Sequence, residues 1–373
     1  MNRTSEIDWF DSKDAQSKIK HHLLSSYLRD WAIIVRQKHV YFCDCFAGAG
    51  AYEDDEPGSP LIAAQILGEI QVRNPSCNFH VRNIEHNSEL YARLQERTFA
   101  AARLVDIRNH HGEFSRFLPT VLREITSHGD PHALFFIDPF GYLDADPEPI
   151  KTIMAAPRRE VLVNLMSYAL VRASGIDEEK WRVGVRRTLG RSNIDFDSGT
   201  VEKEVVDAYC KQFRDLGYYV CAGRVRSFEN PNIYFHMVHI SSHWRALMEM
   251  KRQMRKNVGY QEDLEKTATR QMMIPFVEEF FNEMTLSEYE DRLFETYRPI
   301  GSVPFVDLID RELQFSPFDY GQIKKCLKSL KKRRMVISDG NCEDNTEREN
   351  KEMATLRFVD PPPISEQTTL FDL

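Results

Sequence analysis

Short apolar runs that alternate with helical stretches constrain the fold of this chain more than any other feature of its sequence. Each run has the length of a strand, and the segments between the runs keep the apolar spacing of amphipathic helices. Such alternation is typical of a parallel sheet, because each strand is followed by a right-handed crossover. The runs cover residues 40–46, 78–84, 104–109, 132–138 and 160–166. We therefore predict an α/β fold built on a parallel sheet.

Helices precede these runs and separate them. A first helix is expected over residues 14–36. The others are expected near residues 60–70, 88–103, 114–126, 146–156, 177–190 and 200–216. Two later apolar runs, 218–227 and 232–240, are joined by the polar turn Glu229-Asn230-Pro231, which predicts an antiparallel hairpin at the sheet edge. With this hairpin the predicted sheet has seven strands, and the domain that contains it is expected to end near residue 256.

The pattern changes after a polar helical connector at residues 257–271. Helical patterns and two short strands follow at residues 272–297, 303–313, 319–334, 335–338 and 356–359. Three helices and a β-hairpin predict a winged-helix domain. The tail begins with three prolines and is expected to be disordered. The predicted divisions are residues 1–36, 37–256, 257–271, 272–360 and 361–373.

Charge and hydropathy exclude several classes of protein. The 373 residues have a formal net charge of -8, so a surface coated in basic residues for nucleic acid is excluded and any basic patch must be local. No apolar window approaches the roughly 18 residues that a membrane span needs. The first residues lack the plan of a secretory signal. We expect a cytoplasmic protein.

Cysteine and histidine spacing gives no sign of a metal site. The seven cysteines are dispersed and contain no Cys-x-x-Cys, which argues against a disulfide framework or a closed zinc site. Cys43 and Cys45 lie in an apolar run and are expected to be buried on one face of a strand. The histidine pairs at 21–22 and 110–111 are adjacent residues, which cannot readily share an ion. No metal is expected.

An apolar strand that runs into an acidic residue and a glycine-rich turn is the strongest functional signal. The segment Asp44-Cys45-Phe46-Ala47-Gly48-Ala49-Gly50 follows this plan. Glycine lets the backbone pass close to a ligand and adopt positive φ. Glu85 closes the next strand, where a carboxylate can accept hydrogen bonds from both ribose hydroxyls. Glu113 and Phe114 follow the strand after that.

These positions predict a nucleoside cofactor without phosphates. Residues 53–56 are all acidic and would repel a pyrophosphate. S-adenosylmethionine fits better, because its sulfonium is positive and Asp44 would lie near the cation. Gly48 and Gly50 would contact the methionine end, Glu85 the ribose, and Phe114 or a neighbour the adenine ring.

Asp138, Pro139 and Phe140 end the fourth apolar run, at the sheet edge where ligands of open α/β sheets bind. Methylation of an exocyclic amine requires an acceptor for its N–H hydrogens. The Asp138 carboxylate and the Pro139 carbonyl could supply two acceptors, and Phe140 could stack on the base. The alternative is an Asx turn or helix cap with no chemical role.

Together these motifs resemble the three-Cys-motif partner protein family. The resemblance rests on Asp44 to Gly50, on Gly58-Ser59-Pro60, on Phe135 to Gly141, on the Lys18 to Trp31 helix and on the winged C-terminus. The family resembles class I S-adenosylmethionine-dependent methyltransferases, which implies a Rossmann-like seven-stranded sheet with a terminal hairpin. It also implies a separate partner protein with a three-cysteine, radical-enzyme-like motif.

The target of methylation stays open at this stage. Adenine amino-methyltransferases usually have Asp/Asn-Pro-Pro-aromatic, whereas this chain has Phe140 and Gly141, and Asp-Pro-Phe-Gly also resembles tRNA guanine-N2 methyltransferases. The expected recognition helix is strongly basic and could bind nucleic-acid phosphates. Its cations are Lys324, Lys325, Lys328, Lys331, Lys332, Arg333 and Arg334. An acidic wing from Asp339 to Glu352 would repel DNA, so a protein partner for this domain is a second interpretation.

Two further hypotheses concern binding. The tail segment from Gln367 to Phe371 resembles peptides that dock on bacterial replication sliding clamps. The second functional class is a non-catalytic module that keeps a methyltransferase fold to bind nucleic acid or its partner. Base identity, DNA or RNA, and the need for the partner are not determined by the sequence.

Overall fold

The computed structural model divides into two compact units, Met1–Phe280 and Phe281–Leu373. It describes residues 15–52, 54–139, 145–174, 176, 179–190, 202–226, 234–268, 284–316, 318–339 and 354–360. The tail motif from Gln367 to Phe371 lies outside these ranges, as do Phe140 and most of the predicted acidic wing.

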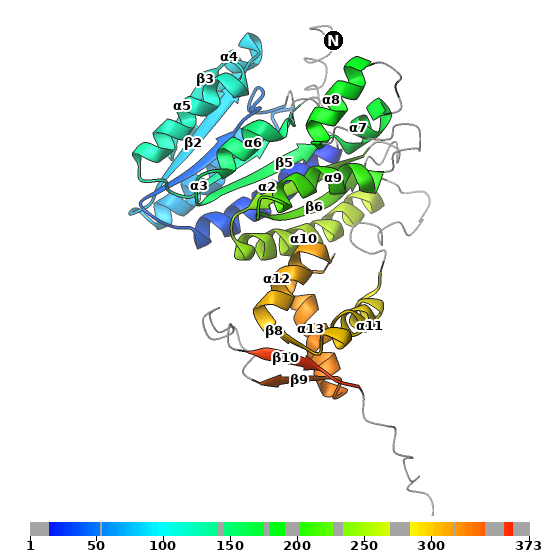
Figure 1. The fold of residues 1–373 in the computed structure, drawn as a ribbon. Helices are drawn as coiled ribbons and strands as arrows, with labels where there is room; N and C mark the ends of the chain where they lie inside the picture. The colour runs from blue at the N-terminus through cyan, green and yellow to red at the C-terminus, as the bar shows by residue number, and fades with distance from the viewer. Residues whose placement is uncertain are drawn as a thin grey trace, which may run out of the picture. The chain divides into compact units, whose positions relative to one another are not determined.

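A mixed seven-stranded sheet forms the centre of the first unit (Figure 1). Its strands are β1 His39–Asp44, β2 Asn78–Glu85, β3 Asp106–His111, β4 Ala133–Ile137, β5 Arg159–Leu165, β6 Tyr219–Arg226 and β7 Tyr234–Ser241. They lie in the order β3-β2-β1-β4-β5-β7-β6. The first five are parallel, whereas β7 runs antiparallel to both β5 and β6. The predicted seven strands and terminal hairpin are confirmed.

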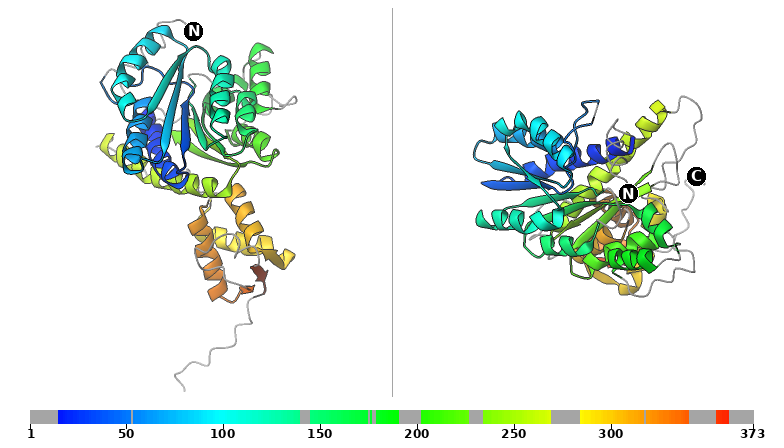
Figure 2. Two further views of the ribbon diagram at one scale, coloured as in Figure 1. Left: turned by 90° about the vertical axis from the view of Figure 1, so that its left-hand side faces the viewer. Right: turned by 90° about the horizontal axis from the view of Figure 1, so that it is seen from above.

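Helices cover both faces of this sheet (Figure 2). On one face a continuous apolar core packs the strands against α5 Phe114–Ser127, α6 Pro147–Met154, α7 Ser167–Ser174, α8 Glu179–Leu189 and α9 Glu202–Arg214. The other layer contains α2 Ala15–Ile34, α3 Ser59–Arg73, α4 Ser88–Phe99 and α10 Trp244–Ala268, with the short 3-10 turn η2 Ala101–Arg103 after α4. Cys43 and Cys45 are buried in the same core, as predicted. Helix α10 continues through residue 256, the predicted end of this domain.

Strand order places a ligand site at one edge of the sheet. The order 3-2-1-4-5 is that of a doubly wound Rossmann-like sheet, in which the crossovers reverse direction between β1 and β4. Ligands of such sheets bind outside the carboxyl ends of the strands at this switch point. Asp44 ends β1 and Asp138 follows β4, so both lie at this point.

A buried carboxylate fixes α2 on the sheet. Glu160 of β5 accepts hydrogen bonds from Trp31 Nε1 at 3.0 Å, from His239 Nε2 at 3.0 Å and from the Tyr27 hydroxyl. Burial by itself would raise the pKa of Glu160, but the bonds from His239, Tyr27 and Trp31 outweigh this effect and lower the pKa. The carboxylate is therefore charged and satisfied inside the protein, and α2 has a defined position.

The second unit contains helices and a small antiparallel sheet. Its elements are α11 Leu286–Tyr297, η5 Arg298–Ile300, β8 Ser302–Pro304, α12 Phe305–Phe315, α13 Tyr320–Lys332, β9 Val336–Asp339 and β10 Thr355–Phe358. The strands lie in the order β8-β10-β9. Three helices and the β9–β10 hairpin are present as expected, but the first helix begins at Leu286, after its N-cap Thr285, whereas it was expected over residues 272–297. Strand β8 was not predicted. The winged-helix interpretation stays a prediction.

No helix among the described residues has both the length and the apolar character needed to cross a membrane.

The Glu160 cluster generates a stability prediction. Trp31→Phe removes one hydrogen bond to the buried carboxylate while it keeps most of the apolar volume. We expect the free energy of unfolding to fall by about 1.5–3 kcal/mol, the range for hydrogen bonds to charged groups. Urea denaturation of both proteins measures it. The matched control, Trp181→Phe, alters a partly buried tryptophan of α8 that makes no bond to Glu160. A loss equal to that of the control would contradict this role of Glu160.

Candidate functional site

The turn after β1 has the shape that its glycines allow. Gly48 and Gly50 have φ values of 60° and 81°, in the left-handed region that favours glycine. The Gly58 amide donates to the Gly50 carbonyl at 2.9 Å, and a Cβ on Gly58 would lie 2.9 Å from the same oxygen. The predicted turn and Gly58 therefore form one tightly packed loop at the carboxyl edge of the sheet.

Arg97 of α4 holds this loop through its carbonyl groups, a contact that was not predicted from the sequence. Its guanidinium donates to the carbonyl of Ala51, to that of Tyr52 at 3.3 Å and to that of Ala49 at 3.5 Å. Three carbonyls of the loop thus accept from one cation, whereas the Gly50 carbonyl between them accepts from the Gly58 amide.

Glu85 lies at the end of β2, as predicted, and shapes the same loop. Its Oε2 accepts from the Gly48 amide at 2.8 Å, and its Oε1 accepts from the Asn87 amide at 2.7 Å. The side chain is buried, and burial raises the pKa of its carboxyl group. Each carboxylate oxygen has a second lone pair, so hydroxyl donors of a ligand remain compatible with these bonds.

Asp44 is a buried acceptor with spare capacity. Its side chain is 0% exposed, and Oδ1 accepts from the Phe46 amide at 3.3 Å. Within the described ranges, Oδ2 has no partner that meets the distance and angle of a hydrogen bond. The Ser59 side chain is nevertheless close enough to lower the pKa of Asp44. Burial, with smaller contributions from Asp138 and Glu85, raises the pKa of Asp44 to about 7.

Asp138 is held by two side chains that the sequence prediction did not include. Lys20 of α2 donates to Oδ1 at 3.0 Å and to Oδ2 at 2.7 Å, and Asn164 of β5 donates to Oδ1 at 2.7 Å. The Lys20 and Asp138 side chains are 14% and 16% exposed, so the pair is only partly screened by water. The bond fixes the orientation of the Asn164 amide, which leaves Oδ1 facing away from Asp138.

The site therefore has more acceptors than donors. Asn164 is buried, and its Oδ1 has no hydrogen-bond partner in the part of the chain that the structure describes. Asp44 Oδ2 likewise has no hydrogen-bond partner among the described residues. A buried acceptor without a donor costs about 1–3 kcal/mol, so such groups indicate a missing donor. A ligand with N–H groups or positive charge would satisfy them.

Two aromatic rings line the neighbouring strand ends. The Phe46 and Phe114 rings have centroids 5.8 Å apart and are tilted by 53°. Phe114 is 8% exposed and begins α5, whereas Glu113 immediately before it is exposed and makes no capping bond. The predicted adenine position is thus an apolar wall formed by both rings. Pro139 is buried beside Asp138, and Phe140 lies outside the described residues.

The basic cluster lies on one side of α13 in the second unit. Ile323, Cys326, Leu327 and Leu330 form the buried side of this helix. Most of the predicted cations are exposed; they are Lys325, Lys328, Lys331, Lys332, Arg333 and Arg334, with Lys324 half-buried. Arg333 pairs with Glu290 at 2.9 Å and Lys324 lies over the Tyr320 ring. The helix ends at Lys332, so the two arginines follow it.

Among the known proteins compared with this chain, similarity was found only to solved structures. No protein-family model matches the chain, and no curated protein matches it. The O-methyltransferase TomG from Streptomyces achromogenes, solved with S-adenosylmethionine, is 15% identical with a TM-score of 0.35, over 58% of this chain and 79% of that one. An O-methyltransferase from Bacillus cereus, solved with S-adenosylhomocysteine, is 11% identical with a TM-score of 0.37, over 64% and 88%. The Methanococcus jannaschii fibrillarin pre-rRNA processing protein is 11% identical with a TM-score of 0.31, over 56% and 68%.

Because these identities and TM-scores are low, the first unit is classified by the strand order of its own sheet. By that order the first unit is a Rossmann-like α/β domain with a mostly parallel seven-stranded sheet. The family resemblance noted from the sequence is not established by any of these matches.

The loop geometry generates a prediction about Gly50. In Gly50→Ala the new Cβ would lie 3.1 Å from Leu94 Cδ1, and an L-residue must adopt a φ of 81°. We expect a loss in unfolding free energy larger than about 1–2 kcal/mol, the cost of left-handed backbone for alanine, because the Cβ also crowds Leu94. Thermal and urea unfolding measure it. Gly217→Ala, with a φ of 85° and nothing within 4 Å of the added Cβ, is the control for backbone strain without crowding. Equal losses would show that the contact with α4 contributes nothing.

Proposed function

We propose that this chain is an S-adenosylmethionine-dependent methyltransferase that acts on an exocyclic base amine of DNA or RNA. The observation that supports it most is the pair of buried, donor-free acceptors at the switch point of the sheet, Asp44 Oδ2 and Asn164 Oδ1. Three carboxylates, Asp44, Glu85 and Asp138, interact electrostatically there, and Lys20 is paired with one of them. A cationic ligand with N–H donors complements this arrangement.

The residues at this edge fit the cofactor. The glycine-rich loop, with positive φ at Gly48 and Gly50, would lie under the methionine end, and Glu85 would accept from the ribose hydroxyls. Asp44 would face the positive charge. The Phe46 and Phe114 rings would cover the adenine. When bound, the cofactor supplies an electrophilic methyl group on its sulfonium.

The acceptor amine would be positioned by the residues after β4. The remaining lone pair of Asp138 Oδ2 and the Pro139 carbonyl would each accept one N–H of an exocyclic amine, which aims the nitrogen lone pair away from both. Asp138 can then receive the proton that the nitrogen loses after methylation. Lys20 and Asn164 hold the Asp138 carboxylate in place, which keeps that acceptor oriented without help from the substrate.

In this proposal, the second unit binds the nucleic acid. The exposed lysines of α13 lie opposite its apolar side and form a row of positive charge suited to phosphates. The three-cysteine-motif partner and the sliding clamp, expected from the sequence, belong to the same proposal. A pull-down of the full chain with and without residues 361–373 tests the clamp.

A second candidate is a non-catalytic module on the same fold. The observation that favours it is the occupancy of Asp138, whose oxygens already accept three hydrogen bonds from Lys20 and Asn164. A carboxylate so engaged has little capacity left for a substrate. In that case the chain would bind a nucleoside cofactor or its product and present nucleic acid to the partner without transferring a methyl group.

Cofactor binding is expected to depend on pH through Asp44. Because its pKa is raised to about 7, the carboxyl group loses its proton as pH rises through 7, and the carboxylate attracts the cation. We expect the affinity for S-adenosylmethionine, measured by calorimetry, to rise from pH 6 to pH 8. Asp44→Asn should weaken binding about 10- to 100-fold at pH 8, equivalent to the loss of a hydrogen bond to a charged group. Comparison with S-adenosylhomocysteine isolates the sulfonium charge. Wild-type and Asp44→Asn profiles that coincide would contradict this role for Asp44.

Methyl transfer separates the two candidate functions. Radiolabelled S-adenosylmethionine is incubated with the chain, its partner, and DNA or RNA. We expect transfer that falls about 100-fold in Asp138→Asn, the scale for loss of a positioned proton acceptor. The matched control is Asp215→Asn, a surface carboxylate paired with Lys211 on α9. Cofactor binding with no transfer to either nucleic acid would instead favour the module.

A further inference from the structure

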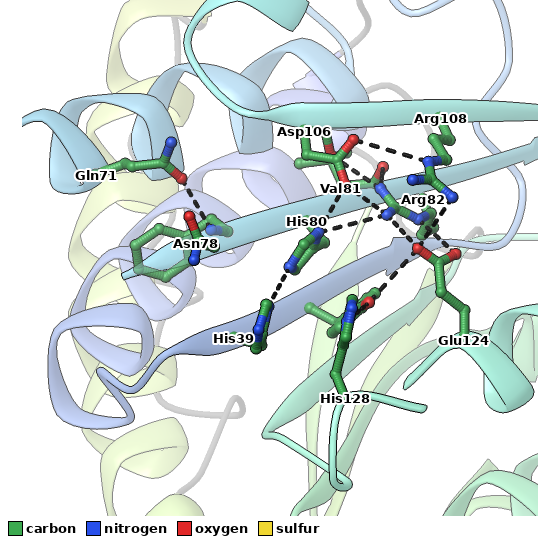
Figure 3. A network of polar contacts seen from close by, with 12 residues as sticks. His39, Gln71, Asn78, His80, Val81, Arg82, Asp106, Arg108, Glu124 and His128 are labelled. Carbon is green, nitrogen blue, oxygen red and sulfur yellow. Dashed lines mark hydrogen bonds and ion pairs between the residues drawn. The ribbon is translucent and has the colours of Figure 1, made fainter. Parts of the chain in front are cut away.

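Three histidines that are far apart in the sequence meet at the opposite edge of the sheet (Figure 3). His39 begins β1, His80 lies in β2 and His128 caps the C-terminus of α5. One nitrogen of each ring lies within 4.8 Å of one nitrogen of each of the other two. Two ligands of a tetrahedral ion with bonds of about 2.0 Å are about 3.3 Å apart. The His39 and His128 rings stack with centroids 4.1 Å apart and an interplanar angle of 9°, so the His128 ring must turn before the three nitrogens can bind one ion.

Hydrogen bonds leave the lone pair of His80 directed toward His39. Its Nδ1 lies 2.7 Å from Asp106 Oδ2, and because a carboxylate only accepts, Nδ1 carries the proton. The Nε2 atom is then the unprotonated nitrogen, and it lies 2.9 Å from His39 Nδ1. A carboxylate behind a histidine is the usual arrangement at metal sites, where it fixes the tautomer and makes the ligand more basic.

His128 has a comparable support from behind. Its Nδ1 lies 2.6 Å from the Tyr41 hydroxyl, which in turn lies 3.5 Å from Glu124 Oε1. If the hydroxyl donates to the carboxylate, it accepts from Nδ1, and Nε2 of His128 is free to bind. His128 is exposed, so its ring can turn toward an ion.

We propose that His39, His80 and His128 bind one zinc-class divalent cation, with solvent in the fourth position. Neutral imidazoles are ligands of this group of metals, and three of them leave one coordination position open. In the ligand-free state the proton of His39 lies between Nδ1 and His80 Nε2; on binding it moves to Nε2 of His39, and both facing nitrogens bind the ion.

The charged groups behind this site are paired with one another, and Lys38 adds one positive charge near His39. Arg82 pairs with Asp106 at 2.7 Å and with Glu124 at 2.5 Å, and Arg108 lies 3.4 Å from Glu124. The two guanidiniums and two carboxylates balance one another. Because Asp106 and Glu124 lie directly behind His80 and Tyr41, the negative groups are nearest to the histidine ligands.

The position of this site separates it from the carboxyl edge of the sheet. His39 and Asp44 are the first and last residues of β1, so the histidines lie about 17 Å from the cofactor edge at 3.3 Å per residue. An ion there would join the end of α5 to the starts of β1 and β2. It would take no part in methyl transfer, and this inference does not rest on the proposed function.

Zinc binding by the full chain tests the proposal. The protein is stripped with a chelator and titrated with Zn²⁺ against a chromophoric competitor, with metal content measured by mass spectrometry. We expect one zinc per chain and a higher midpoint of thermal unfolding when it is bound. His128→Ala should weaken binding at least tenfold, and Asp106→Asn should weaken it about 10- to 100-fold, the range for partners behind a ligand. His132→Ala is the matched control, since that half-buried histidine neighbours Glu160 and His243 and is outside the cluster.

Other outcomes would overturn the proposal. A stripped wild-type chain that retains no zinc at micromolar concentrations would show that the rings form only an apolar and hydrogen-bonded stack. Equal affinities for wild type and His128→Ala would place the ion elsewhere. His128 is exposed, so its variant is expected to fold, and circular dichroism checks this. X-ray absorption showing sulfur ligands would assign the metal to cysteines.

Discussion

The buried Glu160 carboxylate is the interaction on which the candidate site depends. It receives bonds from Tyr27 and Trp31 of α2 and from His239 of β7, so it fixes the N-terminal helix against the centre of the sheet. Lys20 lies about two turns before Tyr27 on the same helix, and this placement brings its ammonium to Asp138. That buried anchor helps to position the lysine at the edge where a ligand is expected, and bonds from Arg252 and Gln253 of α10 to Asp30 hold the same helix.

The two edges of the sheet differ in how their polar groups are satisfied. At the carboxyl edge, Asp44 and Asn164 keep acceptors without donors in the described part of the chain, and the loop that follows Asp44 has positive φ at Gly48 and Gly50. At the other edge, Arg82, Asp106 and Glu124 satisfy one another around the histidines. The first edge is suited to a ligand that brings donors, and the second to an ion that needs only lone pairs.

Local patterns predicted much of the fold, and long-range contacts account for what was missed. Alternating apolar runs and turns were sufficient for the seven strands and the hairpin, and the glycines located the loop after β1. No sequence motif pointed to Lys20, Arg97 or Asn164. Each lies in an ordinary helix or strand, and its partner is remote in the sequence. The cluster of His39, His80 and His128 could not be predicted for the same reason, because its members are far apart in the sequence. Strand β8 has three residues, too few to show a period.

The anchoring of α2 also bears on the order in which the molecule folds. Lys20 is 118 residues from Asp138, and Tyr27 is 212 residues from His239. Contacts of such separation form late, because a long segment must be ordered before they can close. During synthesis α2 precedes the strands that hold it by more than a hundred residues. This helix is therefore seated on the sheet only after those strands have formed, and the carboxyl edge is completed only when β7 has joined the sheet.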